Sequence, residues 1–328
     1  MAYPTQRPTD LEDGDGIDSI PSELNSIPWI DVHNHAHTLS WNDRERYALS
    51  GCAGMVMMAA AYYWTPYKPV QPEDVRYLWD DALNRLPQIR ESHLLDAKVG
   101  VGIHTGARVE NYEALLDVLP EYAELDEIAA IGEIGITEAQ HVAGWSLDEQ
   151  KEVTRRQFEV AADYDLPAVV HTPADLSDVA FPERVSGNLP GYELDLARQQ
   201  EPVLTSDYPK REAVDIDAEL ADEAGLDHEQ VVLSHMDPEI APYVLENTDC
   251  YLSFTVSYPW LLGVSPTDVA EVVAEYGPER ILVETDSAGV LRSDVFAFKR
   301  TIHELSRHGV DIDAIRQVVY ENPQALLP

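Results

Sequence analysis

Short apolar runs alternate with longer amphipathic segments from about residue 28 to the end of the chain. Parallel strands that are buried on both faces have this continuous apolar character, whereas covering helices are apolar on one face only. The pattern therefore predicts eight strand–helix pairs. The expected strands are Trp29–His33, Gly54–Ala59, Lys98–Ile103, Ile128–Glu133, Ala168–His171, Val231–Ser234, Cys250–Phe254 and Ile281–Glu284.

The segments between these strands have the length and periodicity of helices. Ser146 followed by Glu149 has the form of a capping box, which marks a helix start. The expected helices are Asn42–Ser50, Glu73–Leu94, Asn111–Glu124, Ser146–Tyr164, Arg211–Ala224, Pro238–Glu246, Pro266–Tyr276, Val295–Arg307 and a closing helix, Ile312–Leu327.

Eight such units predict an α/β fold, a (β/α)8 TIM barrel in a single domain. A doubly wound open sheet is the alternative. No Gly-x-Gly-x-x-Gly follows an expected strand, so the nucleotide-binding form of the open sheet has little support. We expect a polar, acidic N-terminal extension over residues 1–27 and the barrel over residues 28–328.

Two segments interrupt the rhythm. Tyr63 and Trp64 belong to an aromatic stretch after the second strand, where a barrel builds its site, so we expect them to line a substrate pocket. The alternative is simple packing against a neighbouring loop. A long loop after strand 5, residues 173–207, is rich in Pro and Gly; we expect it to form a lid that shapes substrate choice.

The composition is strongly acidic, with 60 Asp and Glu against 22 Lys and Arg and a formal net charge of −38. Charge repulsion on this scale is screened at molar salt, so we favour a halophilic protein over an ordinary soluble acidic one. Bulk negative charge disfavours a nucleic-acid track. It is compatible with a homo-oligomer, since proteins of salty cells often associate.

The remaining composition points to a cytoplasmic protein. Cys52 and Cys250 are the only cysteines, which suits a reducing compartment. No apolar run approaches the ~20 residues of a membrane helix, so we expect no membrane partner. The polar N-terminus has no signal-peptide pattern.

Ionisable residues close five of the expected strands. In a parallel barrel these ends meet at one mouth, where barrel enzymes build their sites. Four His, one Glu and one Asp there can hold one or two divalent ions, with the Glu as a bridge. The residues are His33 and His35 at the end of strand one, Glu133 at the end of strand four, His171 at the end of strand five, His235 at the end of strand six and Asp286 at the end of strand eight.

This pattern resembles the TatD branch of the metal-dependent hydrolase (amidohydrolase) superfamily, over about residues 28–328. The resemblance implies a (β/α)8 barrel, hydrolytic activity and one or two divalent metals. The matching motifs are Asp31-x-His33-x-His35, Gly-Glu-Ile-Gly at 132–135, the single histidines 171 and 235, Glu-Thr-Asp at 284–286 and Asn-Pro at 322–323.

Several family positions differ here. The run after Gly135 is Ile136-Thr137, with the acidic residue displaced to Glu138, and the third strand keeps one histidine, His104. His171 is followed by Thr-Pro, without the family's arginine. Strands six and eight continue His-Met-Asp and Asp-Ser-Ala. The metal-ligand set is thus retained while several phosphate-proximal positions are not, which disfavours nuclease activity.

We expect zinc as the metal, with Mg or Mn as alternatives. Asp286 would be both a ligand and the base that takes a proton from water, and His104 would contact substrate or polarise an oxyanion. Glu284 lies two residues before Asp286 and is expected to orient a ligand histidine. Asp237 would do the same or cap the helix that follows it.

Three function classes are open. The leading one is a metal-dependent hydrolase that acts on an ester-type bond of a small molecule, either a phosphoester or a carboxylic ester, lactone or amide. The second is a TatD-type deoxyribonuclease. The third is a metal-binding barrel without catalysis, against which the intact set of six ligands speaks.

Overall fold

The computed structural model describes residues 22–59, 69–106, 109–136, 146–172, 210–256, 264–288 and 294–328. Tyr63, Trp64, Glu138 and the loop 173–207 lie outside the described residues, as do residues 1–21 of the expected extension. The end of that extension is the 3-10 helix η3, Ser22–Ser26, in which Leu24 is buried.

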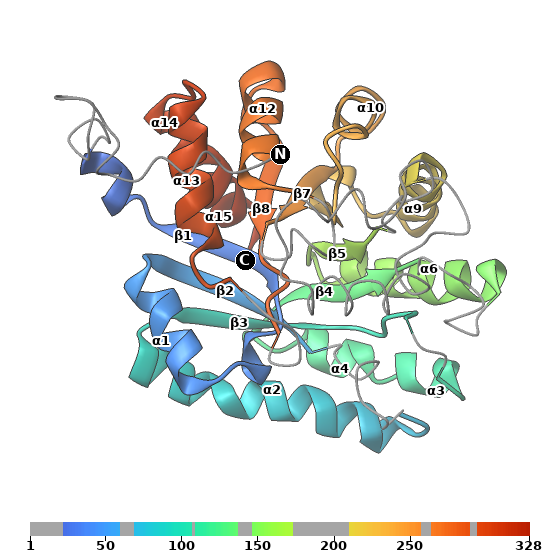
Figure 1. Ribbon diagram of the computed structural model, residues 1–328. Coiled ribbons are helices and arrows are strands. Elements are labelled where there is room, and N and C mark those ends of the chain that lie inside the picture. The colour runs from blue at the N-terminus through green and yellow to red at the C-terminus, as the bar shows by residue number, and fades with distance from the viewer. Residues whose placement is uncertain are drawn as a thin grey trace, which may run out of the picture.

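Eight parallel strands follow one another in sequence order around a barrel (Figure 1). The first and last strands meet through backbone hydrogen bonds, from Asp286 N–H to His33 O (3.0 Å) and from His35 N–H to Ser287 O (2.8 Å). The (β/α)8 prediction is confirmed. The open-sheet alternative is excluded because a doubly wound sheet does not keep its strands in sequence order. The strands are β1 (Trp29–Asn34), β2 (Cys52–Met58), β3 (Asp96–Val101), β4 (Ile128–Gly135), β5 (Ala168–His171), β6 (Val231–Ser234), β7 (Tyr251–Thr255) and β8 (Ile281–Glu284).

Helices surround these strands (Figure 1). The capping box predicted at Ser146 is present: its hydroxyl accepts from Glu149 N–H, and the Glu149 carboxylate accepts from Ser146 N–H. The helices are α1 (Trp41–Leu49), α2 (Pro72–His93), α3 (Tyr112–Leu116), α4 (Leu119–Ala123), α6 (Leu147–Asp163), α9 (Lys210–Ala224), α10 (Ala241–Asn247), α12 (Pro266–Tyr276), α13 (Ala297–Arg307), α14 (Ile312–Arg316) and α15 (Asn322–Leu326).

Two predicted helices are interrupted, and proline explains both. The segment expected as one helix over 111–124 is the pair α3 and α4, because Pro120 has no N–H to donate to the carbonyl four residues earlier. The closing helix changes to a π-helical turn, Gln317–Glu321, just before Pro323. α10 also begins later than predicted, at Ala241.

Two layers of apolar residues hold the barrel. The outer layer lies between strands and helices and includes Trp29, which stacks on Phe298 with ring centroids 4.2 Å apart. The inner layer includes Met58, whose sulfur would lie 2.3 Å from a Cβ built at Gly100. A side chain at position 100 would therefore displace the Met58 sulfur from its present place.

A buried polar seam joins β8 to β1 below the mouth. Thr285 donates to Asp31 twice, from N–H to Oδ1 (3.2 Å) and from its hydroxyl to Oδ2 (2.6 Å). Tyr47 on α1 supplies its hydroxyl to Thr285 Oγ1 at 2.9 Å. Because the Thr285 hydroxyl already donates to Asp31, Tyr47 is the donor in this contact. The seam fixes His33 and His35 relative to Asp286.

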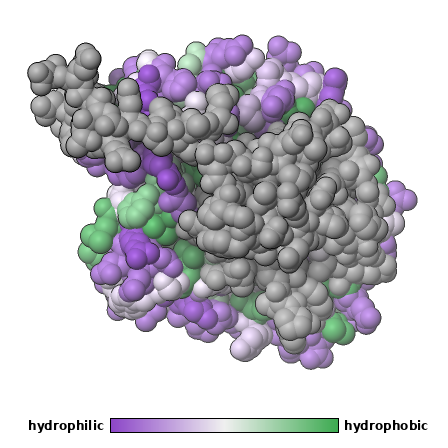
Figure 2. Space-filling model, viewed as in Figure 1, coloured by the Kyte–Doolittle hydropathy of each residue, from purple (hydrophilic) through white to green (hydrophobic). Residues whose placement is uncertain are grey.

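Hydrophilic side chains dominate the described surface on the face in Figure 2, as the excess of acidic residues leads one to expect. None of the helices in the described ranges combines the length and the apolar character that a membrane span requires.

One buried carboxyl group stands apart from the site. Asp217 on α9 is fully buried, and neither of its oxygens has a hydrogen-bond partner among the described residues. Burial raises the pKa of Asp217 well above its ordinary value, against a smaller opposing effect of His171. The folded protein therefore holds a proton at pH values where the unfolded chain has released it.

This difference predicts how stability depends on pH. Since the folded state binds the extra proton, the free energy of unfolding should fall as pH rises from the unfolded pKa near 3.8 through the raised folded value. Asp217→Asn cannot ionise, so its stability relative to wild type should increase as pH rises above the unfolded pKa and level off once the folded wild type has also released its proton. Chemical denaturation at several pH values measures this. Glu219→Gln, an exposed carboxylate on the same helix, is the control; equal slopes for the two variants would contradict the prediction.

Candidate metal centre

The six side chains predicted as ligands come together at the carboxyl-terminal end of the barrel, at the ends of β1, β4, β5, β6 and β8. All are buried, and the most exposed of them, His171, retains 8% of its accessible surface. They are His33, His35, Glu133, His171, His235 and Asp286.

Two irregularities in strand pairing coincide with two of these side chains. The β1–β2 register shifts between Asp31 and Asn34, and the β4–β5 register shifts between Gly132 and Ile134. Strict alternation would send adjacent side chains to opposite faces of a strand, and a bulge breaks this rule. His33 and Glu133 lie within these two irregular stretches.

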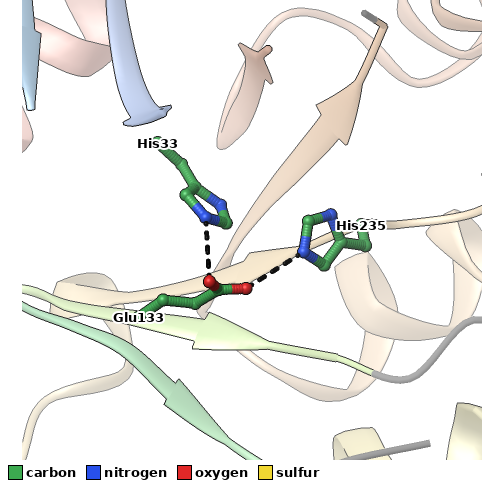
Figure 3. A group of neighbouring side chains, drawn as sticks. All are labelled: His33, Glu133 and His235. Atoms are coloured by element: carbon green, nitrogen blue, oxygen red, sulfur yellow. Dashed lines mark hydrogen bonds and ion pairs between the residues drawn. The ribbon is translucent and has the colours of Figure 1, made fainter. Parts of the chain in front are cut away.

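The Glu133 carboxylate is at the centre of the group. Its Oε2 lies 3.5 Å from Nε2 of both His33 and His35. Its Oε1 lies 2.8 Å from His171 Nδ1 and 3.3 Å from His235 Nε2. Figure 3 shows His33 and His235 facing the two different oxygens. The carboxylate thus faces two sets of imidazoles, as a bridging ligand would.

Asp286 completes the half of the centre around Oε2. Its Oδ1 is 3.3 Å from His35 Nε2 and 3.7 Å from His33 Nε2. Ligand atoms within 4.8 Å of one another define three overlapping candidate groups. These are His33, His35 and Asp286; His33, Glu133 and His235; and His104, Glu133 and His171.

Hydrogen bonds on the far side of each ring determine which nitrogen can bind a metal. His35 Nδ1 lies 2.7 Å from the Met58 carbonyl oxygen, which can only accept. Nδ1 therefore carries a proton, and in the neutral ring the lone pair is on Nε2, the nitrogen that faces Glu133 and Asp286.

Glu284 sets the same tautomer in two histidines at once. Its two oxygens accept from the hydroxyls of Ser234 (3.0 Å) and Thr255 (2.6 Å). Each hydroxyl, having used its proton, is an acceptor for a ring Nδ1: Ser234 for His33 (3.2 Å) and Thr255 for His235 (2.7 Å). Both Nε2 atoms are thus directed to Glu133. Glu284 thus contacts the groups that orient His33 and His235, and its role in orienting ligand histidines stays a prediction.

Charges in the cluster are tightly coupled. Burial alone would raise the pKa of Glu284. The neighbouring His33 and the hydrogen bonds that the Glu284 carboxylate accepts instead lower that pKa to about 2. Burial opposes a charge on His35, yet Asp286 and Glu133 raise its pKa to about 9. Ligand imidazoles must be neutral, so a divalent ion would replace protons that these carboxylates otherwise retain on the histidines.

The residues present fit a divalent metal ion. Three of the inward atoms, His33 Nε2, Glu133 Oε2 and Asp286 Oδ1, are buried and make no hydrogen bond within the described residues. Buried polar atoms of this kind require a partner. Imidazole nitrogens and carboxylate oxygens together are the donor set of zinc and related ions.

His104 differs from the other histidines in the cluster. Its Nε2 is 3.4 Å from Glu133 Oε1, but its Nδ1 accepts a 2.7 Å hydrogen bond from Gly106 N–H. The neutral ring therefore carries its proton on Nε2 and presents a donor to the site. In this tautomer the nitrogen that faces the centre has no lone pair for a metal, and the substrate contact expected of His104 stays a prediction.

Asp237 does not cap the following helix: the N-cap of α10 is Ile240, without a side-chain cap. Its carboxylate instead pairs with Lys210 on α9, with Nζ 3.1 Å from Oδ2. Lys210 also donates a hydrogen bond to the His235 carbonyl. Of the two roles predicted for Asp237, only support for a ligand histidine agrees with these contacts.

Sequence reasoning missed Ser234, Thr255 and Lys210. Thr255 had a usable signal, since it is the polar residue that ends β7 as the predicted ligands end their strands. Ser234 directly precedes a predicted ligand. Lys210 begins a helix far along the chain from His235, and nothing in the local sequence marks it.

Comparison with known proteins places this chain among metal-dependent hydrolases. The sequence model of the family described as TatD related DNase matches residues 30–188. An uncharacterized metal-dependent hydrolase of Methanocaldococcus jannaschii is 27% identical over 293 residues, which cover 89% of this chain and 97% of the relative.

Two solved structures share the fold. A TatD-like protein from Archaeoglobus fulgidus has a TM-score of 0.60 at 22% identity, and the match covers 91% of this chain and 99% of that one. The phosphotriesterase homology protein from Escherichia coli has a TM-score of 0.58 at 12% identity, covering 92% and 98%. At these identities the likeness is one of fold.

The hydrogen-bond pattern predicts different protonation of two rings, which nitrogen-15 NMR of histidine-labelled protein detects. Near neutral pH, His104 should carry its proton on Nε2. His235 in zinc-loaded protein should carry its proton on Nδ1 and lose the free lone-pair signal of Nε2. Assignment uses the His104→Gln and His235→Gln variants. A proton on His104 Nδ1 would contradict the role of this side chain as a donor.

Proposed function

Because the chain belongs to the TatD-related branch of the metal-dependent hydrolase superfamily, we propose that this centre cleaves an ester-type bond of a small molecule by hydrolysis. The single observation that carries the proposal is the buried Glu133 carboxylate, whose two oxygens face separate sets of imidazole nitrogens. An arrangement of this kind has little structural use without an ion, because burial of so many ionisable groups is costly.

We assign the ligands by the half of the centre in which they lie. His33, His35 and Asp286 would hold one ion. His171 and His235, which both lie near Glu133 Oε1, would hold a second, with Glu133 shared between them. The four imidazoles favour zinc. Magnesium and manganese are the alternatives because they prefer oxygen ligands, which the carboxylates of Glu133 and Asp286 provide. A single ion would use the first set.

The bound metal would supply Lewis acidity, which lowers the pKa of water from 15.7 towards ~7. Asp286 is suited to take the proton of the attacking water, since its Oδ1 is buried at the mouth beside His35 and lacks a hydrogen-bond partner within the described residues. It would then deliver the proton to the leaving group. His104 would donate from Nε2 to the oxygen on which negative charge develops.

The substrate class follows from the charges near the centre. A phosphoester, or a carboxylic ester, lactone or amide, fits a site in which the neutral imidazole of His104 is the expected donor to the substrate. The family's arginine after strand five is replaced here by Thr172-Pro173. Lys210 is committed to Asp237 and the His235 carbonyl. A long polyanionic substrate would therefore meet little positive charge.

The second candidate is a TatD-type deoxyribonuclease, which the description of the matching family favours. The net charge of −38 and the missing arginine weigh against it. We further propose that the protein works in a salt-rich cytoplasm, where its charges are screened. Assays therefore belong at molar salt as well as at low salt.

Activity of two site variants tests the proposal. Zinc- or manganese-loaded protein should hydrolyse at least one member of a panel of small phosphoesters, carboxylic esters and lactones. Asp286→Asn should lower kcat at least about 100-fold because it removes the base as well as a ligand. His33→Ala should reduce activity similarly through the loss of a ligand. His308→Ala, an exposed histidine beyond α13, is the matched control and should leave kcat unchanged.

Two results would overturn this assignment. Unchanged activity in Asp286→Asn and His33→Ala would show that the reaction takes place elsewhere. Cleavage of single- or double-stranded DNA that both variants abolish, with no turnover of the small esters, would establish the nuclease instead.

A further inference from the structure

We propose that Lys210 is a positioning residue for the metal centre. Its ammonium group holds the backbone of His235 in the conformation that brings the His235 imidazole to Glu133. The inference rests on the proposed function, since it takes His235 as a ligand. It adds a residue from the outer helical layer to a site otherwise built on strand ends.

Lys210 is buried at the first turn of α9, with 2% of its surface exposed. Lysine is rarely buried to this degree unless its charge is paired. Here the ammonium donates to the carbonyl of His235 and pairs with Asp237 Oδ2 at 3.1 Å. Both partners belong to the turn that follows β6, so one side chain from α9 holds both sides of that turn.

The turn needs such support because His235 has a positive φ of +60°. Residues with a Cβ seldom adopt this left-handed conformation, which persists only where the surroundings fix it. The next residue, Met236, is fixed by a 3.0 Å hydrogen bond from its N–H to Ser253 O. The conformation is thus held by neighbours on both sides of the turn.

Each polar group of His235 has its own anchor. The backbone N–H donates to Glu284 Oε1 (3.2 Å), and ring Nδ1 donates to Thr255 (2.7 Å). The carbonyl accepts from Lys210. The first two anchors come from the barrel strands β8 and β7, and the third comes from the helical layer. Without Lys210 the carbonyl would lose its charged donor, and the peptide could turn towards a more common conformation, carrying the ring off Glu133.

Stability alone gives a weak reason for this ion pair. A buried pair recovers little more than the cost of removing two charges from water, so an apolar pair of similar volume often serves as well. The specific hydrogen bond to a ligand's own carbonyl is what an apolar pair could not reproduce. We therefore expect the effect of Lys210 to fall on the ion that His235 helps to hold, and to spare the half formed by His33, His35 and Asp286.

Titration with Co²⁺, followed by calorimetry and visible absorption, tests this on the full-length protein. His235→Ala first identifies the ion that depends on His235. Lys210→Met should weaken the binding of that ion by about 10- to 100-fold, the range seen for residues that support a ligand. Other Co²⁺ binding should stay at the wild-type affinity. Lys210→Arg, which keeps a charged donor, should recover part of the loss.

Arg280→Met is the matched control. Arg280 is a cation that also holds backbone carbonyls, those of Thr248 and Leu245, but it contacts none of the six ligands. This variant should lower the melting temperature and leave both Co²⁺ affinities unchanged. If it weakens Co²⁺ binding as much as Lys210→Met does, the effect is one of general stability and the inference is wrong.

The double variant Lys210→Met/Asp237→Asn covers a failure of Lys210→Met to fold, since it leaves no unpaired buried carboxylate. Wild-type Co²⁺ affinities in the folded single or double variant, with an ion lost in His235→Ala, would overturn the inference and leave the proposed function intact. Wild-type Co²⁺ binding in His235→Ala would show that no bound ion depends on His235, which would overturn the inference and leave only the ion assigned to His33, His35 and Asp286.

Discussion

The carboxylate of Glu133 is the group on which the rest of this site depends. It is buried at the end of β4, and five imidazole nitrogens lie within 3.5 Å of its oxygens. Burial alone would disfavour its charge, but His104, His33 and their neighbours hold the pKa of Glu133 well below its ordinary value. A permanently charged carboxylate surrounded by imidazoles is a site prepared for a cation, and the other features of the mouth keep those imidazoles in place.

Two kinds of support fix the rings. His35 is held by the backbone carbonyl of residue 58. This support requires the correct strand register but no particular side chain at that position. His33 and His235 come from different strands, and one carboxylate, Glu284, controls both through two hydroxyls. A change at Glu284 would consequently disturb both halves of the centre. The backbone carbonyl of Met58, by contrast, holds one ring only.

The sequence was sufficient to predict the parts of the structure that follow from strand ends. An apolar run closed by an ionisable residue is a local pattern, and in a parallel barrel all such residues meet at one mouth. The six proposed ligands and the eight strands were predictable for this reason. The prediction of one helix over 111–124 was wrong. Its apolar periodicity is continuous, but Pro120 has no N–H to continue the helical hydrogen bonds.

Ring tautomers and Lys210 could not be predicted, because both depend on contacts between residues far apart in the chain. Asp237 illustrates the difficulty: a carboxylate before a helix is usually a cap, and only the position of α9 reveals its pairing with Lys210. The expectations for Tyr63, Trp64 and the loop 173–207 stay predictions.

The most direct test of the central claim is anomalous diffraction from crystals of zinc-loaded protein, recorded on both sides of the zinc absorption edge. The account predicts at least one strong anomalous peak at coordination distance, about 2.0–2.2 Å, from a Glu133 oxygen and from Nε2 of His33 and His35. Peaks confined to the acidic surface, with none beside Glu133, would contradict it.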